Sequence, residues 1–380
     1  MRSWCIVVPR ERGEEVRRRL VEEDKLAPHL RIVREGDRLL IPTTDRVDIG
    51  FPIAERDFPE GYVAVRSYKD VADVPPALRA SLPSSFDVVG DIAVIKIPRE
   101  LHGHREAIGR AILRWNPRIL VVVEDRGVKG KHRIRQIEVV AGEPRTTTRH
   151  LEHGLTYLVD LGEAYFSPRL ASERLRIADL TRDGEVVADP FAGVGPYAIL
   201  IAKTRRPREV HASDANPVAV ELLRTNVAAN RADRVTVRAG DARTILRQIA
   251  PVDRVILDLP HSAFDFLPDA FGALEPRGTV HVYRILETVD EQEAIQAIRR
   301  VAGAAGLRIT DLRRRHVRAY SPTQHHTAFD VTVVRASRPS GPGTSRSAGR
   351  TSPRRATRAS GTRPVRTARQ PGARAHRKTR

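Results

Sequence analysis

Cysteine is almost absent from this sequence, because Cys5 is the single thiol among 380 residues. One cysteine excludes an internal disulfide and a zinc site built from several cysteines, and we expect no metal. Long apolar runs are absent too, since no stretch approaches the roughly 20 apolar residues that span a bilayer. No apolar block follows the N-terminal arginines, which argues against a signal peptide and against a membrane partner. These absences favour a cytoplasmic protein, which we expect to be a monomer.

Acidic residues are missing from the last 44 residues, Ser337–Arg380, which contain twelve arginines and one lysine. This segment carries +13 of the formal charge of +19 and leaves +6 for the rest of the chain. It has almost no large apolar side chains to offset the entropy of ordering, so residues 337–380 are predicted to be a disordered tail. Such a basic segment favours nucleic acid as the partner, and a solvated tail that only aids solubility is the alternative.

The chain ahead of the tail is long enough for two or three domains. Residues 1–70 are predicted to form a small α/β domain, in which Arg12–Glu23 has the apolar spacing of an amphipathic helix. After a proline pair, residues 75–160 are predicted to form a second α/β domain with a helix at Leu101–Ile112. Its predicted strands are Asp91–Ile97, Ile119–Val123 and Ile137–Ala141, with the basic segment Asp125–Gln136 as a loop or hairpin.

Strands and helices alternate through residues 161–336. The predicted strands are Val186–Ala188, Glu209–Ala212, Val235–Arg238, Arg254–Leu257, Thr279–Tyr283, Leu307–Leu312 and Ala328–Val334. Helices are predicted from Pro196, over Pro217–Asn230 and over Glu291–Ala305. Repeated strand–helix units indicate a Rossmann-like α/β domain with a doubly wound, mostly parallel sheet. No helix separates the last two strands, so we expect them to pair as a hairpin at the sheet edge.

A glycine-rich turn follows the first of these strands and opens a helix, with the sequence Asp189-Pro190-Phe191-Ala192-Gly193-Val194-Gly195. Glycine lets the backbone approach a ligand closely, as nucleotide cofactors require. Gly193, Gly195 and Ala198 also match the G-x-G-x-x-A dinucleotide pattern. A nicotinamide cofactor is therefore one alternative, and a plain tight turn is another.

Three aspartates favour S-adenosylmethionine as the cofactor. Asp189, Asp214 and Asp241 each follow one of three successive strands, so we expect them to meet at the ligand-binding edge of the sheet. Asp189 can face a cationic amino-acid group. Asp214 can accept hydrogen bonds from two ribose hydroxyls, and Asp241 can accept one from the adenine amino group. Taken singly, each acid is more often a cap or a turn residue.

The fourth strand ends at Asp258-Leu259-Pro260-His261. This run resembles the (Asp/Asn)-Pro-Pro-Tyr-type motif of methyltransferases that act on exocyclic or ring nitrogens. In that motif a side-chain oxygen and a nearby backbone carbonyl hold the target nitrogen beside the methyl group. An ordinary exit from a strand into a loop is the alternative.

Longer runs resemble the archaeal and eukaryotic tRNA (guanine-37, N1)-methyltransferases. They are Ser85–Ile97, His132–Glu143, Ala164–Ile177, Asp189–Pro196, Ser213–Asn230 and Asp258–Leu267. The Phe-Ser-Pro-Arg…Glu-Arg run ahead of the glycine turn is the most specific, because generic methyltransferases lack it. The resemblance covers most of residues 80–290. It implies an N-terminal domain that binds the tRNA elbow, a middle domain that helps hold the anticodon loop, and a catalytic domain.

The resemblance also implies the roles of particular residues. The family's general base falls on Glu173, and its guanine-contacting arginine falls on Arg133, with Arg135 as the second candidate. Where the family usually has asparagine, this chain has Asp258, which only accepts hydrogen bonds when ionised. The expected cofactor contacts are Tyr165, Asp189, Phe191, Gly193, Gly195, Asp214, Asp241 and Pro260, and the expected RNA contacts are Arg133, Arg135, Arg169 and Arg174.

The chemistry of guanine requires two charged groups. Its N1 carries a proton at neutral pH, so a base must remove that proton as the methyl group arrives, and negative charge then builds on O6. Glu173 and Arg133 suit these two roles. The alternatives are a solvated helix carboxylate that pairs with Arg169 or Arg176, and a phosphate contact by Arg133.

Four other functions stay open. Two belong to wyosine synthesis at the same tRNA position, namely methylation of the tricyclic precursor and aminocarboxypropyl transfer. The third is a non-catalytic RNA-binding protein with a degenerate methyltransferase fold. A nicotinamide dehydrogenase is the fourth, although no hydride-acceptor site is evident.

Overall fold

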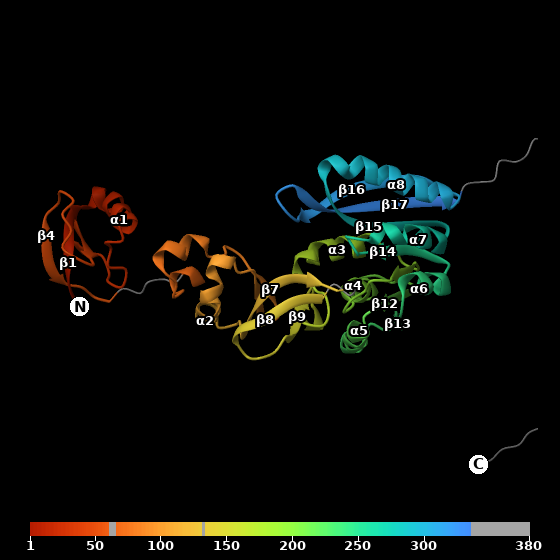
Figure 1. The fold of residues 1–380 in the computed structure, drawn as a ribbon, viewed down its shortest axis with the longest axis horizontal. Coiled ribbons are helices and arrows are strands. Elements are labelled where there is room, and N and C mark those ends of the chain that lie inside the picture. The colour runs from red at the N-terminus through yellow and green to blue at the C-terminus, as the bar shows by residue number, and fades with distance from the viewer. Residues whose placement is uncertain (61–65, 131–133, 336–380) are drawn as a thin grey trace, which may run out of the picture. The chain divides into compact units, whose positions relative to one another are not determined.

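The computed structural model describes residues 1–60, 66–130 and 134–335. Arg133 and the predicted tail at 337–380 therefore lie outside the described residues. The described chain forms a four-stranded sheet near the N-terminus, a second four-stranded sheet, a two-stranded hairpin and a seven-stranded sheet (Figure 1). This is the α/β architecture that the strand–helix alternation predicts.

The first sheet is antiparallel and carries one helix. Its elements are β1 (Arg2–Pro9), η1 (Arg10–Arg12), α1 (Gly13–Glu22), β2 (Val33–Glu35), β3 (Arg38–Thr43) and β4 (Ile53–Asp57), in the strand order β2-β3-β1-β4. The predicted helix over Arg12–Glu23 is confirmed as α1, which buries Val16 and Leu20. Their four-residue spacing puts both on one face of the helix.

The second sheet has the order β5-β6-β7-β8 and is covered by α2. The elements here are η2 (Tyr68–Asp70), η3 (Pro76–Ser81), β5 (Asp87–Val89), β6 (Ile92–Ile95), η4 (Arg99–His104), α2 (Arg105–Trp115), β7 (Val121–Lys129) and β8 (Ile134–Gly142). The helix predicted over Leu101–Ile112 is wrong in its first turn, which is the 3₁₀ helix η4. Leu101 is fully buried there, so its apolar spacing imitates a longer α-helix. Of the basic segment Asp125–Gln136, the described residues 125–129 and 134–136 belong to the antiparallel strands β7 and β8, as the hairpin alternative predicted.

The seven-stranded sheet has the order β13-β12-β11-β14-β15-β17-β16. Its strands are β11 (Val186–Asp189), β12 (Glu209–Asp214), β13 (Val235–Ala239), β14 (Val252–Leu257), β15 (Leu274–Glu287), β16 (Leu307–Ala319) and β17 (Gln324–Arg335). The helical elements are η5 (Pro168–Leu170), α3 (Ala171–Leu180), α4 (Pro196–Thr204), α5 (Pro217–Ala229), α6 (Ala242–Ile249), η6 (Ala263–Phe266), α7 (Leu267–Ala273), η7 (Thr288–Asp290) and α8 (Glu291–Ala304). The first five strands are parallel, so their carboxyl ends share one edge. This confirms the predicted doubly wound sheet.

The last two strands form the predicted antiparallel hairpin, and β16 is the edge strand. Both extend well beyond the predicted segments, toward the turn that connects them. β16 carries the basic side chains Arg308, Arg313, Arg314, Arg315, His316 and Arg318. Charged side chains on an edge strand discourage pairing with another chain.

A two-stranded hairpin, β9 (Thr147–Glu152) and β10 (Leu155–Asp160), is joined to the seven-stranded unit by Asn226 of α5 and by Asn230, which follows the helix. The Asn226 amide accepts a hydrogen bond from the Leu158 N–H at 2.7 Å and donates to the Leu158 carbonyl at 3.0 Å. The same amide donates to the carbonyl of Val194 at 3.0 Å. One buried side chain therefore connects the hairpin to the glycine turn and fixes the segment that leads to α3.

Candidate active site

A cavity of about 320 Å³ lies at the carboxyl edge of the seven-stranded sheet, where the glycine turn and the exits of β12 and β14 meet. The structure brings most of the predicted site residues together on its wall. These are Tyr165, Phe191, Gly193, Asp214, Asp241, Asp258, Pro260 and Arg174. Glu173, Asp189 and Gly195 do not line it. The parallel strands end at one edge, which is why residues so far apart in the sequence meet there.

Glycine is needed at the two positions of the turn for different structural reasons. Both have positive φ, +54° at Gly193 and +94° at Gly195. A Cβ at Gly195 would lie 2.4 Å from Cδ1 of Leu223 in α5, so this glycine is required for the packing of α4 on α5. Gly193 lines the cavity and leaves that side open for a ligand.

Asp214 and Asp241 combine a structural role with spare acceptor capacity. Asp214 accepts from the N–H of Gly193 at 2.9 Å and from the N–H of Asn216 at 2.8 Å. Asp241 caps α6, because its carboxylate accepts from the N–H of Arg243 at 3.0 Å. A carboxylate has about four lone-pair sites, so each of these acids can also accept from hydroxyl or amino groups in the cavity.

Asp189 is fully buried and does not line the cavity. Neither of its oxygens accepts a well-formed hydrogen bond from the described residues. Burial and the nearby charges of Asp258 and Asp214 raise its pKa well above the usual range, which the N–H of Phe191 offsets only in part. A buried acid with so few partners suits a nearby cationic group.

Asp258 faces the cavity at the exit of β14, with 15% of its side chain exposed. Burial raises its pKa to about 6, Glu173 adds to this effect, and Arg174 and Arg318 oppose it. The carboxylate oxygen Oδ1 lies 3.9 Å from Nε2 of His326 on β17. Asp258 is therefore a hydrogen-bond acceptor whose charge responds to small changes in its surroundings.

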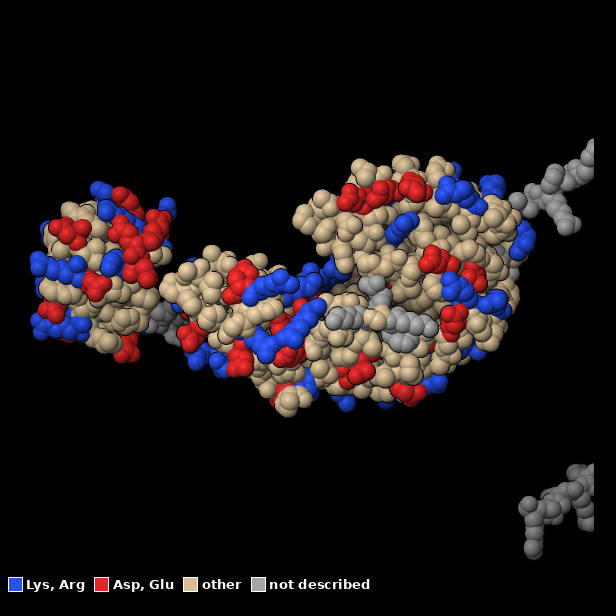
Figure 2. All heavy atoms as spheres, viewed as in Figure 1, with Lys and Arg blue, Asp and Glu red and all other residues tan. Residues whose placement is uncertain are grey.

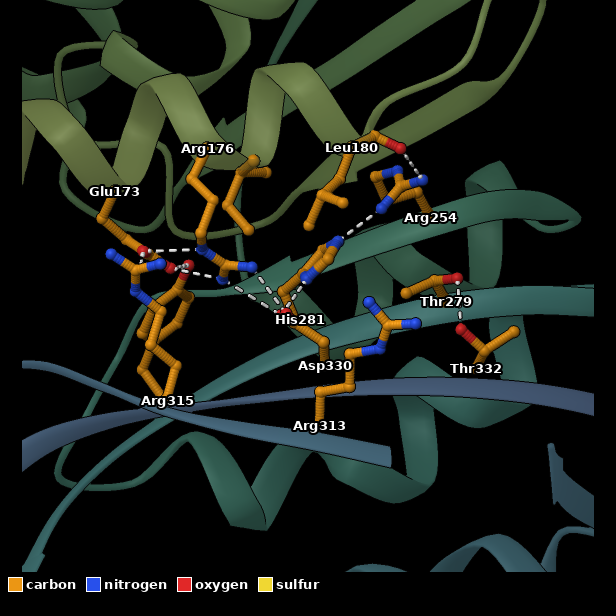
Figure 3. Close-up of polar contacts among 12 residues, drawn as sticks. Glu173, Arg176, Leu180, Arg254, Thr279, His281, Arg313, Arg315, Asp330 and Thr332 are labelled. Atoms are coloured by element: carbon orange, nitrogen blue, oxygen red, sulfur yellow. Dashed lines mark hydrogen bonds and ion pairs between the residues drawn. The ribbon is translucent and has the colours of Figure 1, made fainter. Parts of the chain in front are cut away.

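Glu173 is buried on α3 and belongs to a network of charged side chains (Figure 3). The Arg176 guanidinium donates to both of its oxygens, at 2.6 and 2.8 Å, and also donates to Asp330 at 2.6 Å. Asp330 in turn bonds Nδ1 of His281 at 2.6 Å. The pairing with Arg176 matches one part of the alternative that the sequence left open, but the carboxylate is buried and not solvated. The arginine holds it in one orientation.

Glu173 is nevertheless connected to the cavity by two tyrosine hydroxyls. Tyr197, which lines the cavity, donates to Tyr283 at 3.3 Å, and Tyr283 donates to Glu173 at 2.8 Å. Burial raises the pKa of both tyrosines well above the usual value, so both keep their protons. The carboxylate is thus two hydroxyl groups away from the cavity.

The described arginines of the predicted RNA set differ in exposure. Arg174 is buried and lines the cavity, and it donates to Glu152 at 2.7 Å and to the Ser167 carbonyl at 2.9 Å. This placement argues against a contact with RNA phosphate. Arg135 is bonded to Asp125 at 2.9 Å, and its guanidinium lies 5.6 Å from the centre of the Tyr165 ring. The side chain of Arg169 is half exposed.

The β16–β17 hairpin contributes to this wall in a way that was not predicted from the sequence. Arg318, Tyr320 and His326 all line the cavity from that hairpin. The dense run of arginine and histidine in β16 was the available signal. Its spacing, however, does not predict that the hairpin returns to the exit of β14.

These features together define a class I S-adenosylmethionine-dependent methyltransferase, in which strand-end acids and a glycine turn surround one cavity at the edge of a doubly wound sheet. Family models agree with this assignment. Residues 148–310 match the TRM5/TYW2 methyltransferase domain, residues 71–146 the TYW2 N-terminal domain, and residues 5–51 the tRNA methyltransferase 5 N-terminal domain.

The relatives identify the family. The chain is 38% identical over 333 residues to the tRNA (guanine(37)-N(1))-methyltransferase Trm5b of Pyrococcus abyssi, with 87% of this chain and 99% of the relative covered. A solved complex of aTrm5 with tRNALeu has 30% identity and a TM-score of 0.63, over 86% of this chain and 99% of that chain. The tRNA 4-demethylwyosine(37)-methyltransferase Taw21 of Saccharolobus solfataricus is 30% identical over 65% of this chain and 92% of its own length. The chain belongs to the tRNA (guanine-37, N1)-methyltransferase family.

No helix in the described ranges has both the length and the apolar character needed to cross a membrane. The same residues contain no cluster of three or more potential metal ligands.

Proposed function

We propose that this chain transfers a methyl group from S-adenosylmethionine to N1 of guanine-37 in the anticodon loop of tRNA. The observation that carries the proposal is the cavity of a family member, which Asp214, Asp241 and Asp258 line together with Gly193 of the glycine turn. Arg169 and Arg135 are its candidate RNA contacts among the described residues. Basic side chains also gather over β7 and β8 on the face seen in Figure 2.

The residues present fit the cofactor. Asp214 would accept from the ribose hydroxyls and Asp241 from the adenine amino group. Asp189 does not line the cavity, so it would favour the cationic amino-acid end by its charge and not by direct contact. Tyr165, Phe191 and Pro260 would supply apolar surface for the remainder. When bound, S-adenosylmethionine supplies an electrophilic methyl group.

The chain's own task is to handle the N1 proton and the charge on O6. We assign the general base to Glu173, which would receive the proton through Tyr197 and Tyr283 as each hydroxyl passes its own proton onward. We assign to Asp258 the hydrogen bond that orients the N–H edge of guanine. We assign to Arg133 the stabilisation of the negative charge on O6, as the family resemblance implies. Arg135, whose guanidinium lies over the Tyr165 ring, is the second candidate.

Single-turnover transfer to a tRNA transcript, followed by mass analysis of the modified nucleotide, tests the activity. An aminocarboxypropyl product, or modification only of a tricyclic precursor, would show that the chain catalyses one of the wyosine reactions and does not methylate guanine. A lack of any product with guanine-37 would refute the proposal.

Glu173→Gln tests the assigned base. Glutamine keeps the shape and removes the basicity, so we expect cofactor and tRNA affinity within a few fold and a transfer rate lower by about 10²-fold or more. Glu185→Gln is a matched control, because Glu185 is also paired with an arginine, Arg254, at 2.7 Å, whereas the tyrosine hydroxyls that connect the cavity to Glu173 do not bond it. A wild-type rate for Glu173→Gln, or an equal loss in both variants, would show that Glu173 is structural.

A further inference from the structure

One buried histidine in the cavity wall has no hydrogen-bond partner among the described residues. His326 on β17 is 2% exposed, and it lines the cavity. Neither ring nitrogen is hydrogen-bonded within the described part of the chain. A neighbouring ring is that of Tyr283, with centroids 5.4 Å apart, so the imidazole is held by packing. Buried polar groups are normally hydrogen-bonded, and an exception that faces a cavity points to a ligand.

The surroundings of His326 determine its protonation state. Burial lowers its pKa to about 4, and the positive charges of Arg318 and His261 contribute to this shift. The ring is therefore neutral near pH 7, and a neutral imidazole offers one N–H donor and one acceptor. Arg318 also lines the cavity, and its positive charge disfavours protonation of the imidazole.

Asp258 and His326 present opposite hydrogen-bonding groups to the same part of the cavity. Nε2 of His326 and Oδ1 of Asp258 are 3.9 Å apart, too far for a hydrogen bond between them. The spacing instead suits two groups that contact neighbouring positions on one base edge. Asp258 accepts, and the imidazole N–H donates.

From this juxtaposition we infer that His326 is a specificity-determining residue, which donates a hydrogen bond to O6 of the target guanine while Asp258 accepts from the N–H groups beside it. The inference rests on the proposed function. Enzymes that act on a base read its Watson–Crick edge by hydrogen bonds of this kind. Adenine reverses both contacts, because it has an amino donor at position 6 and a lone pair at N1. The His326 N–H would then face the amino donor of adenine, and the Asp258 carboxylate would face the N1 lone pair. A buried site rejects a base that leaves its polar groups unpaired in this way.

The test uses full-length protein and two tRNA transcripts, with guanosine or inosine at position 37. Inosine keeps O6 and the N1 proton and lacks only the 2-amino group. His326→Phe removes the donor and keeps a flat ring, whereas His326→Gln keeps an N–H donor. His325→Phe is the matched control, since His325 is adjacent on β17, stacks on His316 at 4.3 Å and does not line the cavity. Single-turnover rates are measured together with cofactor affinity and melting temperature.

We expect His326→Phe to slow transfer to guanosine and inosine by the same factor, about tenfold or more. His326→Gln should recover most of this loss, and His325→Phe should stay near the wild-type rate. Cofactor affinity should be unchanged in all three variants. A wild-type rate for His326→Phe would overturn the inference.

Equal losses for the Phe and Gln variants would also overturn it, because the role of His326 would then be packing. If the wild-type protein modifies neither transcript, the proposed function fails first and the inference falls with it. If the wild type is active and His326→Phe is equally active, only the inference about His326 fails and the proposed function stands.

Discussion

Replacing Asp258 by asparagine, which the family usually has at this position, should make the protein more stable near neutral pH. Folding raises the pKa of this carboxyl from 3.8 to about 6, chiefly by burial. A carboxyl whose pKa is raised by folding holds its proton more tightly in the folded state. Its favourable contribution to the free energy of unfolding is therefore complete below pH 3.8 and is lost as the pH rises through about 6. Above that pH the folded protein carries a partly buried charge, which the asparagine variant would not have.

The size of the effect follows from the shift. One pKa unit corresponds to about 1.4 kcal/mol, so a shift of about two units corresponds to roughly 3 kcal/mol at most. The asparagine amide must also find partners, which reduces the gain to about 1–3 kcal/mol. For a folding unit of this size, each kcal/mol moves the melting temperature by about 2–4 °C.

The assay is the melting temperature of wild type and Asp258→Asn from pH 5 to pH 8. We expect the variant to melt several degrees higher at pH 8 and the difference to shrink toward pH 5. Asp265→Asn is the control, because Asp265 is exposed in the segment that follows the same strand exit. A variant that is less stable at pH 8, or a difference that does not change with pH, would refute the argument from burial.

Two further predictions concern the cofactor and the tail. Asp214→Ala should weaken S-adenosylmethionine binding by at least about tenfold, as measured by calorimetry, because the ribose hydroxyls lose a charged acceptor and the Gly193 N–H loses its partner. Unchanged affinity would contradict the ribose assignment. Removal of Ser337–Arg380 should flatten the dependence of log affinity for tRNA on log salt, by roughly 0.7–0.9 for each phosphate that the tail binds. The modified base should stay the same, and an identical salt slope would exclude the tail from the RNA interface.

The parallel sheet and the cofactor end of the cavity were predictable from the sequence. Strand–helix alternation depends on local apolar spacing, and the carboxyl ends of parallel strands always share one edge. Asp214, Asp241 and Asp258 could therefore be placed in one cavity without coordinates. Gly193 followed from its turn between β11 and α4.

The position of Glu173 behind two tyrosines was decided only by the tertiary structure, because nothing in the spacing of α3 shows what packs beneath it. The same holds for Arg174. Its neighbours in the sequence suggest a basic surface residue, whereas the fold buries it against Glu152. Both depend on partners from distant elements, β15 for Glu173 and β9 for Arg174.

The nucleobase end of the cavity depends most strongly on tertiary structure. The sequence determined that β16 and β17 form a hairpin, since no helix fits between them. It did not determine that this hairpin is long enough to bring His326 within 3.9 Å of Asp258. That distance depends on the strand order β14-β15-β17 and on the register of the pairing, which are set by side-chain packing across the whole sheet. A local sequence pattern carries no information about either.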